Sequence, residues 1–112
     1  MAVFVSNIVI EQGFDFNTTF ELEDTATQNP LNLTGYTVSS QLRKTYTSSS
    51  ATTFSSTITE VNQGKVKISL GSTITSNLKS GRYVYDVKIT STGGIVEKVV
   101  EGSALVRAGV TR

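Results

Sequence analysis

Hydrophobic and polar residues alternate along most of this chain, so that every second side chain is apolar in several stretches. The alternation is cleanest over residues 65–70, where Val66, Ile68 and Leu70 are separated by Lys67 and Ser69. Successive side chains of a β-strand point to opposite faces, so a period of two predicts strands with one buried face. The pattern predicts strands over residues 3–10 (broken near 6–7), 14–22, 36–43, 54–58, 65–70, 83–89 and 95–106 (interrupted at Gly102).

Turn-forming residues separate these stretches. Residues 62–64 and 92–94 end in Gly64 and Gly94 and predict tight hairpin turns, because glycine accepts a positive φ. Further turns are predicted over residues 24–30, which hold the only proline, and at 34–35. Residues 44–53 are rich in Ser and Thr and have few apolar side chains, which predicts an exposed loop or the tip of a long hairpin.

One segment breaks the period of two. In residues 72–80, Ile74 and Leu78 lie four positions apart, Ser72 can cap a helix and Gly81 can end one. We therefore expect one short helical turn near 72–80.

Many short strands with regular turns predict a sandwich or small barrel. A chain of 112 residues has the size of one domain, and it shows neither an internal repeat nor a boundary. We expect a single all-β domain over residues 1–112, an immunoglobulin-like β-sandwich of seven to eight strands.

Two tyrosines carry the most specific local pattern, within residues 78–87. Tyr83 has the position of a tyrosine corner, in which a hydroxyl at the start of the sixth strand bonds to upstream backbone. Tyr85 then takes the inward position that a cysteine occupies in antibody domains. The alternative is a pair of ordinary core tyrosines. In this strand order Arg43 and Asp86 are expected on one outer face, where opposite charges on neighbouring strands attract.

Composition narrows the possible chemistry. The chain has no Cys and no His, which excludes disulfides, thiolate metal sites and a conventional catalytic triad. Its net charge of +1 lacks the basic excess typical of proteins that bind nucleic acid or anionic membranes. The first residues show neither a basic segment nor a long apolar run, so neither a secretion signal nor a membrane span is expected.

Four carboxylates lie close together in the sequence, at Asp15, Glu21, Glu23 and Asp24. Calcium needs several oxygens converging within one loop, whereas alternating strand positions diverge, so a solvated face is favoured over a metal site. The chain also lacks a Gly-x-Ser-x-Gly elbow and a phosphate-binding glycine loop. We expect a protein that is not an enzyme, with no catalytic residue, no cofactor and no metal.

The two ends are the candidate interface. They carry apolar residues and few charges, and strands at a sheet edge invite pairing with another chain. The candidate residues are Ala2, Val3, Phe4, Val5, Arg107, Val110 and Arg112. The alternative is that the two ends pair with each other or complete the sheets.

Several short motifs occur in a recognisable order: 10–16 (IEQGFDF), 33–36 (LTGY), 64–70 (GKVKISL), 78–87 (LKSGRYVYDV), 99–102 (VVEG) and 109–112 (GVTR). This series resembles small virion structural proteins of tailed bacteriophages, of the contractile-tailed cyanophage type. It is also similar to the immunoglobulin-like N-terminal domain of phage upper baseplate proteins. Those proteins continue into a stalk and a receptor-binding region, so the shorter chain implies an adaptor or accessory role instead of receptor binding.

The resemblance implies a non-enzymatic virion component, assembled in the host cytoplasm and present in many copies. It would dock on the tail or baseplate through contacts with other virion proteins. From the low net charge we expect contact with neither nucleic acid nor membrane. One alternative is a capsid decoration protein. A weaker one is a carbohydrate- or ligand-binding sandwich that uses the 44–53 loop, which offers a single aromatic residue, Tyr46.

Overall fold

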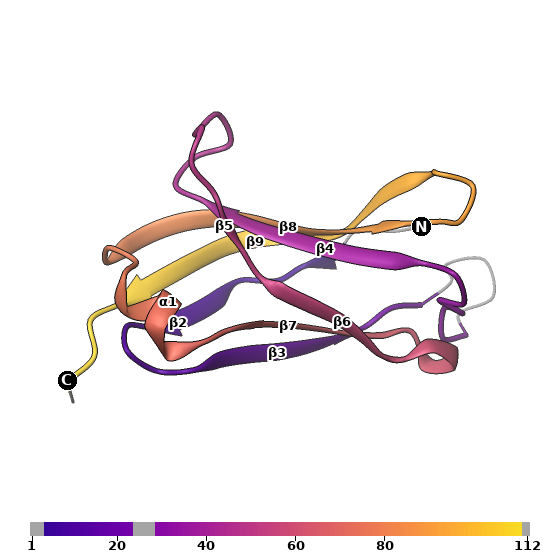
Figure 1. The fold of residues 1–112 in the computed structure, drawn as a ribbon, viewed down its shortest axis with the longest axis horizontal. Helices are drawn as coiled ribbons and strands as arrows, with labels where there is room; N and C mark the ends of the chain where they lie inside the picture. The colour runs from indigo at the N-terminus through magenta and orange to yellow at the C-terminus, as the bar shows by residue number, and fades with distance from the viewer. Residues whose placement is uncertain (1–3, 24–28, 111–112) are drawn as a thin grey trace.

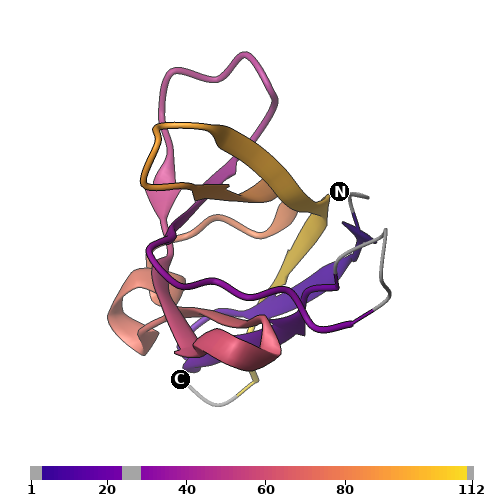
Figure 2. The same ribbon diagram turned by 90° about the vertical axis from the view of Figure 1, so that its right-hand side faces the viewer.

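Two β-sheets packed face to face make up the molecule (Figure 1). The computed structural model describes residues 4–23 and 29–110. The principal extents are 45, 28 and 21 Å. Figure 2 views the molecule from one end and shows the β8–β9 hairpin and the long loop before β5 on one side of it.

The larger sheet has the strand order β1-β9-β8-β4-β5, with β2 also paired to β9. Its strands are β1 (Phe4–Val5), β2 (Ile8–Glu11), β4 (Thr37–Arg43), β5 (Thr52–Thr53), β8 (Gly81–Thr90) and β9 (Val96–Arg107). The smaller sheet has the order β3-β7-β6, from β3 (Phe16–Glu21), β6 (Ser55–Glu60) and β7 (Lys65–Leu70). A 3-10 turn, η1 (Val61–Gln63), joins β6 to β7, and a single helical turn, α1 (Ser72–Ser76), lies between β7 and β8.

This connectivity is that of an immunoglobulin-like sandwich, which confirms the predicted fold class. In that fold, strands B, D and E form one sheet, while C, F and G form the other. Here the sheet of strands B, D and E corresponds to β3, β6 and β7, and the sheet of strands C, F and G corresponds to β4, β8 and β9. The described residues form nine strand segments instead of seven or eight, because the first strand is broken at Ser6–Asn7 as predicted and the long loop contains the two-residue β5.

The core lies between the sheets and follows the alternating pattern. Val66, Ile68 and Leu70 of β7 are buried, while the residues between them are partly exposed. Phe54 joins the two layers, because its ring lies 6.1 Å from that of Phe16 in the smaller sheet and 6.2 Å from that of Tyr85 in the larger one. The buried hydrophobic residues are Ile8, Ile10, Leu22, Leu33, Leu42, Phe54, Val66, Ile68, Leu70, Leu78, Tyr85, Val87, Ile89, Val99, Val100, Ala104 and Val106.

The predicted interruption of the last strand at Gly102 is wrong. β9 continues through this residue, and its pairing with β8 is irregular instead between Val87 and Lys88, where Val99 is the extra residue on β9. Gly102 is needed for another reason. A Cβ at this position would collide with the backbone carbonyl of Ser6, because the N-terminal segment runs alongside β9 and Ser6 lies against Gly102.

The helical turn forms where it was predicted but with different ends. Its N-cap is Gly71, not Ser72, and it makes no side-chain capping bond. The Asp15 carboxylate accepts a hydrogen bond from the Ser72 N–H at 2.8 Å and so satisfies one free donor of the first turn from a distant segment. The turn ends at Asn77, four residues before Gly81.

The other turns are of the expected kinds. The segment before β7 closes on Gly64, whose φ of 64° lies in the left-handed region. Of the turn predicted over residues 24–30, residues 24–28 lie outside the described residues. Next to them, Glu23 and Pro30 form an isolated antiparallel bridge.

Candidate functional site

The two ends that form the candidate interface pair with each other in the larger sheet, which is the alternative that the sequence leaves open. β1 and β2 pair in parallel with β9, with Phe4 opposite Val100 and Ile8 opposite Ala104. The Gln12 N–H continues this ladder by donating to the Arg107 carbonyl at 2.9 Å. Because both ends carry few charges, the first and last strands can lie side by side in one sheet of this chain.

The individual candidate residues have different surroundings. Val5 is exposed at the edge of the sheet, and Phe4 is paired through its backbone. The Arg107 guanidinium donates to the Glu11 carboxylate at 2.6 Å. Val110 is 96% exposed. Ala2, Val3 and Arg112 lie outside the described residues.

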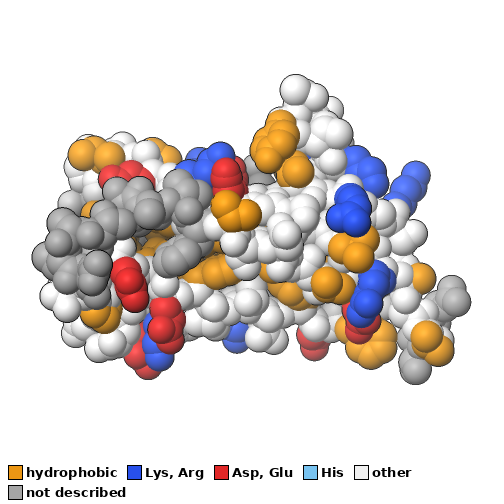
Figure 3. All heavy atoms as spheres, turned by 180° about the vertical axis from the view of Figure 1, so that it is seen from behind, with side chains coloured by type: hydrophobic (Ala, Val, Ile, Leu, Met, Phe, Trp, Pro, Cys, Tyr) orange, Lys and Arg blue, Asp and Glu red, His pale blue; other side chains and the backbone are white. Residues whose placement is uncertain are grey.

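An apolar surface exists at the end of the molecule where α1, the β2–β3 turn and the C-terminal segment meet (Figure 1). Phe14, Ile74 and Val110 are 44%, 43% and 96% exposed there, and we call these three residues the end patch. Gly109 lies against the Phe14 ring, since a Cβ on Gly109 would come within 3.0 Å of it. In Figure 3 hydrophobic side chains reach the surface at this end, beside Lys and Arg side chains.

Hydrogen bonds hold the backbone beneath the end patch. The buried Thr75 hydroxyl accepts from the Gly13 N–H at 3.1 Å and lies 2.8 Å from the Phe14 carbonyl, to which it donates. The Gln12 side-chain amide donates to the Leu78 carbonyl. With the bond between Asp15 and Ser72, these contacts tie the turn before β3 to α1. The alternation that placed Phe14 inside the core is therefore wrong, because the strand begins only at Phe16.

Ile95 and Val96 are exposed at the tip of the β8–β9 hairpin, and Val61 is exposed in η1. These elements lie at the opposite end of the long axis from α1 (Figure 1).

The outer face of the larger sheet is hollowed beneath the loop between β4 and β5. The hollow has a volume of about 320 Å³. The side chains around it include Gln41, Arg43, Tyr46, Asp86, Lys88, Lys98 and Glu101.

Arg43 and Asp86 both line this hollow, so they share the outer face on which the sequence placed them. Their register is offset, because Asp86 lies opposite Gln41 and Arg43 lies opposite Val84. Each charge has another partner. The Arg43 guanidinium donates to the Ser48 carbonyl at 2.6 Å and to the Gln41 amide oxygen at 3.0 Å, and the Asp86 carboxylate lies 4.0 Å from the Lys98 ammonium.

The two tyrosines of β8 bond to backbone at two different places. The Tyr83 hydroxyl donates to the Lys79 carbonyl at 2.8 Å, which is the bond of a tyrosine corner, and the Lys44 ammonium lies 4.7 Å from the ring centre. Tyr85 is buried, and its hydroxyl donates to the Ser6 carbonyl at 2.6 Å. Burial raises the pKa of Tyr85, and the hydrogen bond to Ser6 opposes this shift.

The described carboxylates of the acidic stretch are exposed and separate. Asp15 bonds to α1, Glu21 pairs with Lys65, and Glu23 extends from the end of the smaller sheet. Asp24 lies outside the described residues. Within residues 4–23 and 29–110, no three metal-ligating side chains come together.

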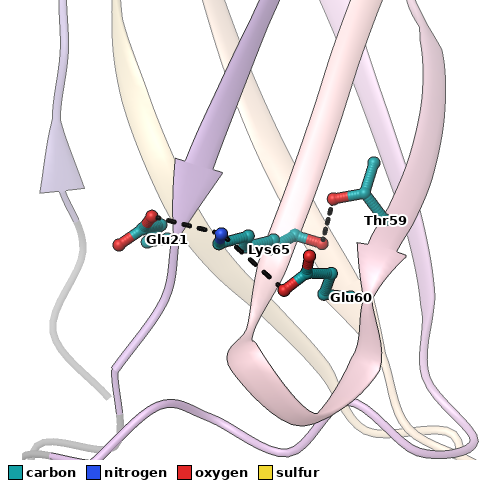
Figure 4. Close-up of polar contacts among 4 residues, drawn as sticks. All are labelled: Glu21, Thr59, Glu60 and Lys65. Carbon is teal, nitrogen blue, oxygen red and sulfur yellow. Dashed lines mark hydrogen bonds and ion pairs between the residues drawn. The ribbon is translucent and has the colours of Figure 1, made fainter.

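Lys65 joins the three strands of the smaller sheet (Figure 4). Its ammonium lies 3.8 Å from the Glu21 carboxylate on β3 and 3.7 Å from that of Glu60 on β6, while the Thr59 hydroxyl donates to its carbonyl at 3.4 Å. Such exposed pairs contribute little to stability, and this arrangement offers no convergent acid and base.

No helix in the described part of the chain has the length and hydrophobicity of a membrane span.

No protein-family model matches this chain, and no curated protein matches it. Among solved structures, the chain is similar to an internalin-like protein of Listeria monocytogenes, with 16% sequence identity and a TM-score of 0.47. The similarity covers 96% of this chain and 28% of that chain, so this chain spans little more than a quarter of that protein's length.

Proposed function

We propose that this chain is a non-catalytic structural module of a tailed-phage virion, an adaptor or accessory protein that docks on the tail or baseplate through protein–protein contacts. The series of sequence motifs that resembles phage virion proteins supports the assignment to a tailed-phage particle. The observation that carries the docking role is the end patch, whose three apolar side chains are exposed at the same end of the molecule, two of them on segments held by the bonds of Thr75.

The end patch has the properties of a docking surface. An exposed aromatic ring beside aliphatic side chains gains free energy when a partner removes it from water. The bonds of Thr75 and Asp15 fix the backbone beneath it, so little conformational entropy is lost on docking. The β1 edge, next to the exposed Val5, offers a second and smaller contact area.

The carboxylates support docking better than catalysis. Asp86 and Glu101 lie in an open hollow beside the Lys98 ammonium, and Glu21 and Glu60 share Lys65. Paired-carboxylate hydrolysis needs two acids whose environments separate their roles, whereas Asp86 and Glu101 lie at the same distance from one ammonium, that of Lys98.

The test is the protein content of purified particles of the phage that encodes this chain. Quantitative mass spectrometry should find the chain in many copies per particle, and immunogold labelling should place it on the tail or baseplate. Label on the head would favour the decoration alternative. Absence of the chain from purified particles, together with its presence in the soluble lysate, would overturn the virion assignment.

A further inference from the structure

The hollow on the outer face of the larger sheet has the form of a small ligand site. Its volume of about 320 Å³ lies at the lower end of the range of ligand pockets, roughly 300–1,000 Å³. Its floor consists of β4, β8 and β9, which are the central strands of the sheet. Side chains on paired strands keep fixed spacings, so the polar groups on this floor are positioned before a ligand arrives.

The loop between β4 and β5 places an aromatic ring beside this floor. The loop projects from the sandwich (Figures 1 and 2), and Tyr46 lines the hollow while remaining 77% exposed. Two bonds hold the loop: Arg43 donates to the Ser48 carbonyl, and the Ser48 N–H donates to the Thr45 carbonyl at 3.1 Å. The ring therefore offers an apolar platform on an anchored segment.

The charges of the hollow argue against an ionic ligand. Lys98 lies 4.0 Å from both Asp86 and Glu101, so these three groups neutralise one another in part while keeping hydrogen-bonding capacity toward solvent. Two of the five N–H donors of Arg43 are engaged, with Ser48 and Gln41. The lining holds three cations, Arg43, Lys88 and Lys98, and two carboxylates, Asp86 and Glu101, so an ion of either sign would meet groups of its own sign.

A fully apolar ligand is disfavoured as well, because it would remove water from these charged groups without replacing their hydrogen bonds. A neutral ligand with many hydroxyl groups avoids both problems, because it carries no charge and can replace the hydrogen bonds that water makes to the charged groups. Each of its hydroxyls can donate to a carboxylate or to the Gln41 carbonyl and accept from an ammonium. The apolar C–H face of a sugar ring can stack on Tyr46.

We propose that this hollow binds a neutral carbohydrate, with Tyr46 as the stacking platform and Gln41, Asp86, Lys98 and Glu101 as the hydrogen-bonding floor. This site is separate from the end patch and does not depend on a virion role for the chain.

The test is an NMR titration of the isotope-labelled chain with three neutral oligosaccharides, maltohexaose, cellohexaose and chitohexaose, and with an anionic hyaluronan hexasaccharide. At millimolar concentration, at least one neutral sugar should shift the backbone amide signals of residues 39–46, 84–88 and 98–101. Tyr46→Ala should weaken this binding at least about tenfold, while Tyr46→Phe keeps the ring and should bind as the native chain does. Ile95→Ser, at the distant hairpin tip, is the control for a general surface change.

Tyr46 is exposed, so its replacement leaves the core intact, and the amide spectrum of each variant verifies its fold. Three results would overturn the proposal: no shift with any neutral sugar, shifts outside the hollow, or binding that Tyr46→Ala leaves unchanged. Tighter binding of the hyaluronan fragment would overturn the choice of a neutral ligand.

Discussion

At the scale of single residues, hydrogen bonds to backbone carbonyls determine the role of several polar side chains. Tyr83, Tyr85 and Thr75 each donate to a carbonyl outside their own strand or turn. No buried side-chain nitrogen or oxygen among the described residues lacks a partner. Replacing one of these hydroxyls therefore leaves an acceptor unsatisfied, at a cost that depends on how far water can reach it.

Removing the Tyr83 hydroxyl should measure how much the tyrosine-corner bond contributes to the free energy of unfolding. We expect Tyr83→Phe to lower the free energy of unfolding by about 1 kcal/mol, because the Lys79 carbonyl loses its donor but lies where water can partly replace it. Tyr36→Phe is the control, since the Tyr36 hydroxyl makes no hydrogen bond with a described residue, and should stay within about 0.5 kcal/mol. Urea unfolding of both variants gives the comparison. Equal losses would show that the corner bond contributes nothing specific.

The raised pKa of Tyr85 predicts a loss of stability in alkali. The folded chain keeps the Tyr85 proton to a higher pH than the unfolded chain, whose tyrosine titrates near 10.0. Stability from this group is therefore complete below that pH and falls as the pH rises through the folded value. Urea unfolding between about pH 8 and pH 11 should show the advantage of the native chain over Tyr85→Phe shrinking with pH. Parallel stability curves for the two proteins would contradict this.

The close contact of Ser6 with β9 should make a side chain at Gly102 costly. Gly102→Ala is expected to lower the free energy of unfolding by about 2–3 kcal/mol, because the new methyl group meets the Ser6 carbonyl. Gly93→Ala is the matched control. Its new Cβ would have the Ser91 hydroxyl 3.8 Å away as its nearest neighbour, so a change within about 0.5 kcal/mol is expected. Thermal unfolding can rank the two variants, and a neutral Gly102→Ala would mean that the segment around Ser6 can move away.

At the scale of elements, α1 is stabilised by a segment far away in the sequence. It has five residues, too few for a helix that is stable alone, and its N-cap makes no side-chain bond. Asp15 and the backbone of Gly13 and Phe14 supply the missing contacts. The turn before β3 and α1 should therefore unfold together.

Thr75→Val tests this coupling. We expect a loss of about 1–3 kcal/mol, because the buried hydroxyl bonds to the Gly13 N–H and the Phe14 carbonyl. Thr73→Val, on the exposed side of the same turn, has the same change in shape and should be nearly neutral. Hydrogen exchange should show faster exchange at Gly13 and Ser72 together in the Thr75 variant. Faster exchange at only one of them would argue against a joint unit.

The strands could be predicted because their signal is local. The alternation of Val66, Ile68 and Leu70 is enough to place β7 and its buried face. The errors concern contacts between distant segments. The contact with Ser6 explains Gly102, and Asp15 replaces the predicted cap at Ser72. The pairing of the first and last strands is one of the two alternatives that the sequence leaves open. Exposure of Phe14 could have been suspected from Gly13 before it, whereas the hollow under Tyr46 depends on how the loop folds over the sheet.

At the scale of the whole molecule, the described residues display the end patch, the hollow beneath Tyr46, the hairpin tip with Ile95 and Val96, and the β1 edge with Val5. The proposed docking role assigns the first to a virion partner. The hollow, as the proposed sugar site, lies on another face of the molecule. A module of this kind acts through its exposed side chains. Variants that change the surface and keep the fold therefore test its function best.

The most direct measurement is the amount of this chain on purified particles when a phage lacking its gene is supplied with variants. Ile74→Ser and Phe14→Ser change the end patch, and Val61→Ser changes an exposed apolar residue at the opposite end of the molecule. Thermal unfolding first establishes that all three remain folded. The proposed docking surface predicts at least about a tenfold loss of occupancy for the two patch variants and native occupancy for Val61→Ser. Full occupancy of folded patch variants would contradict it.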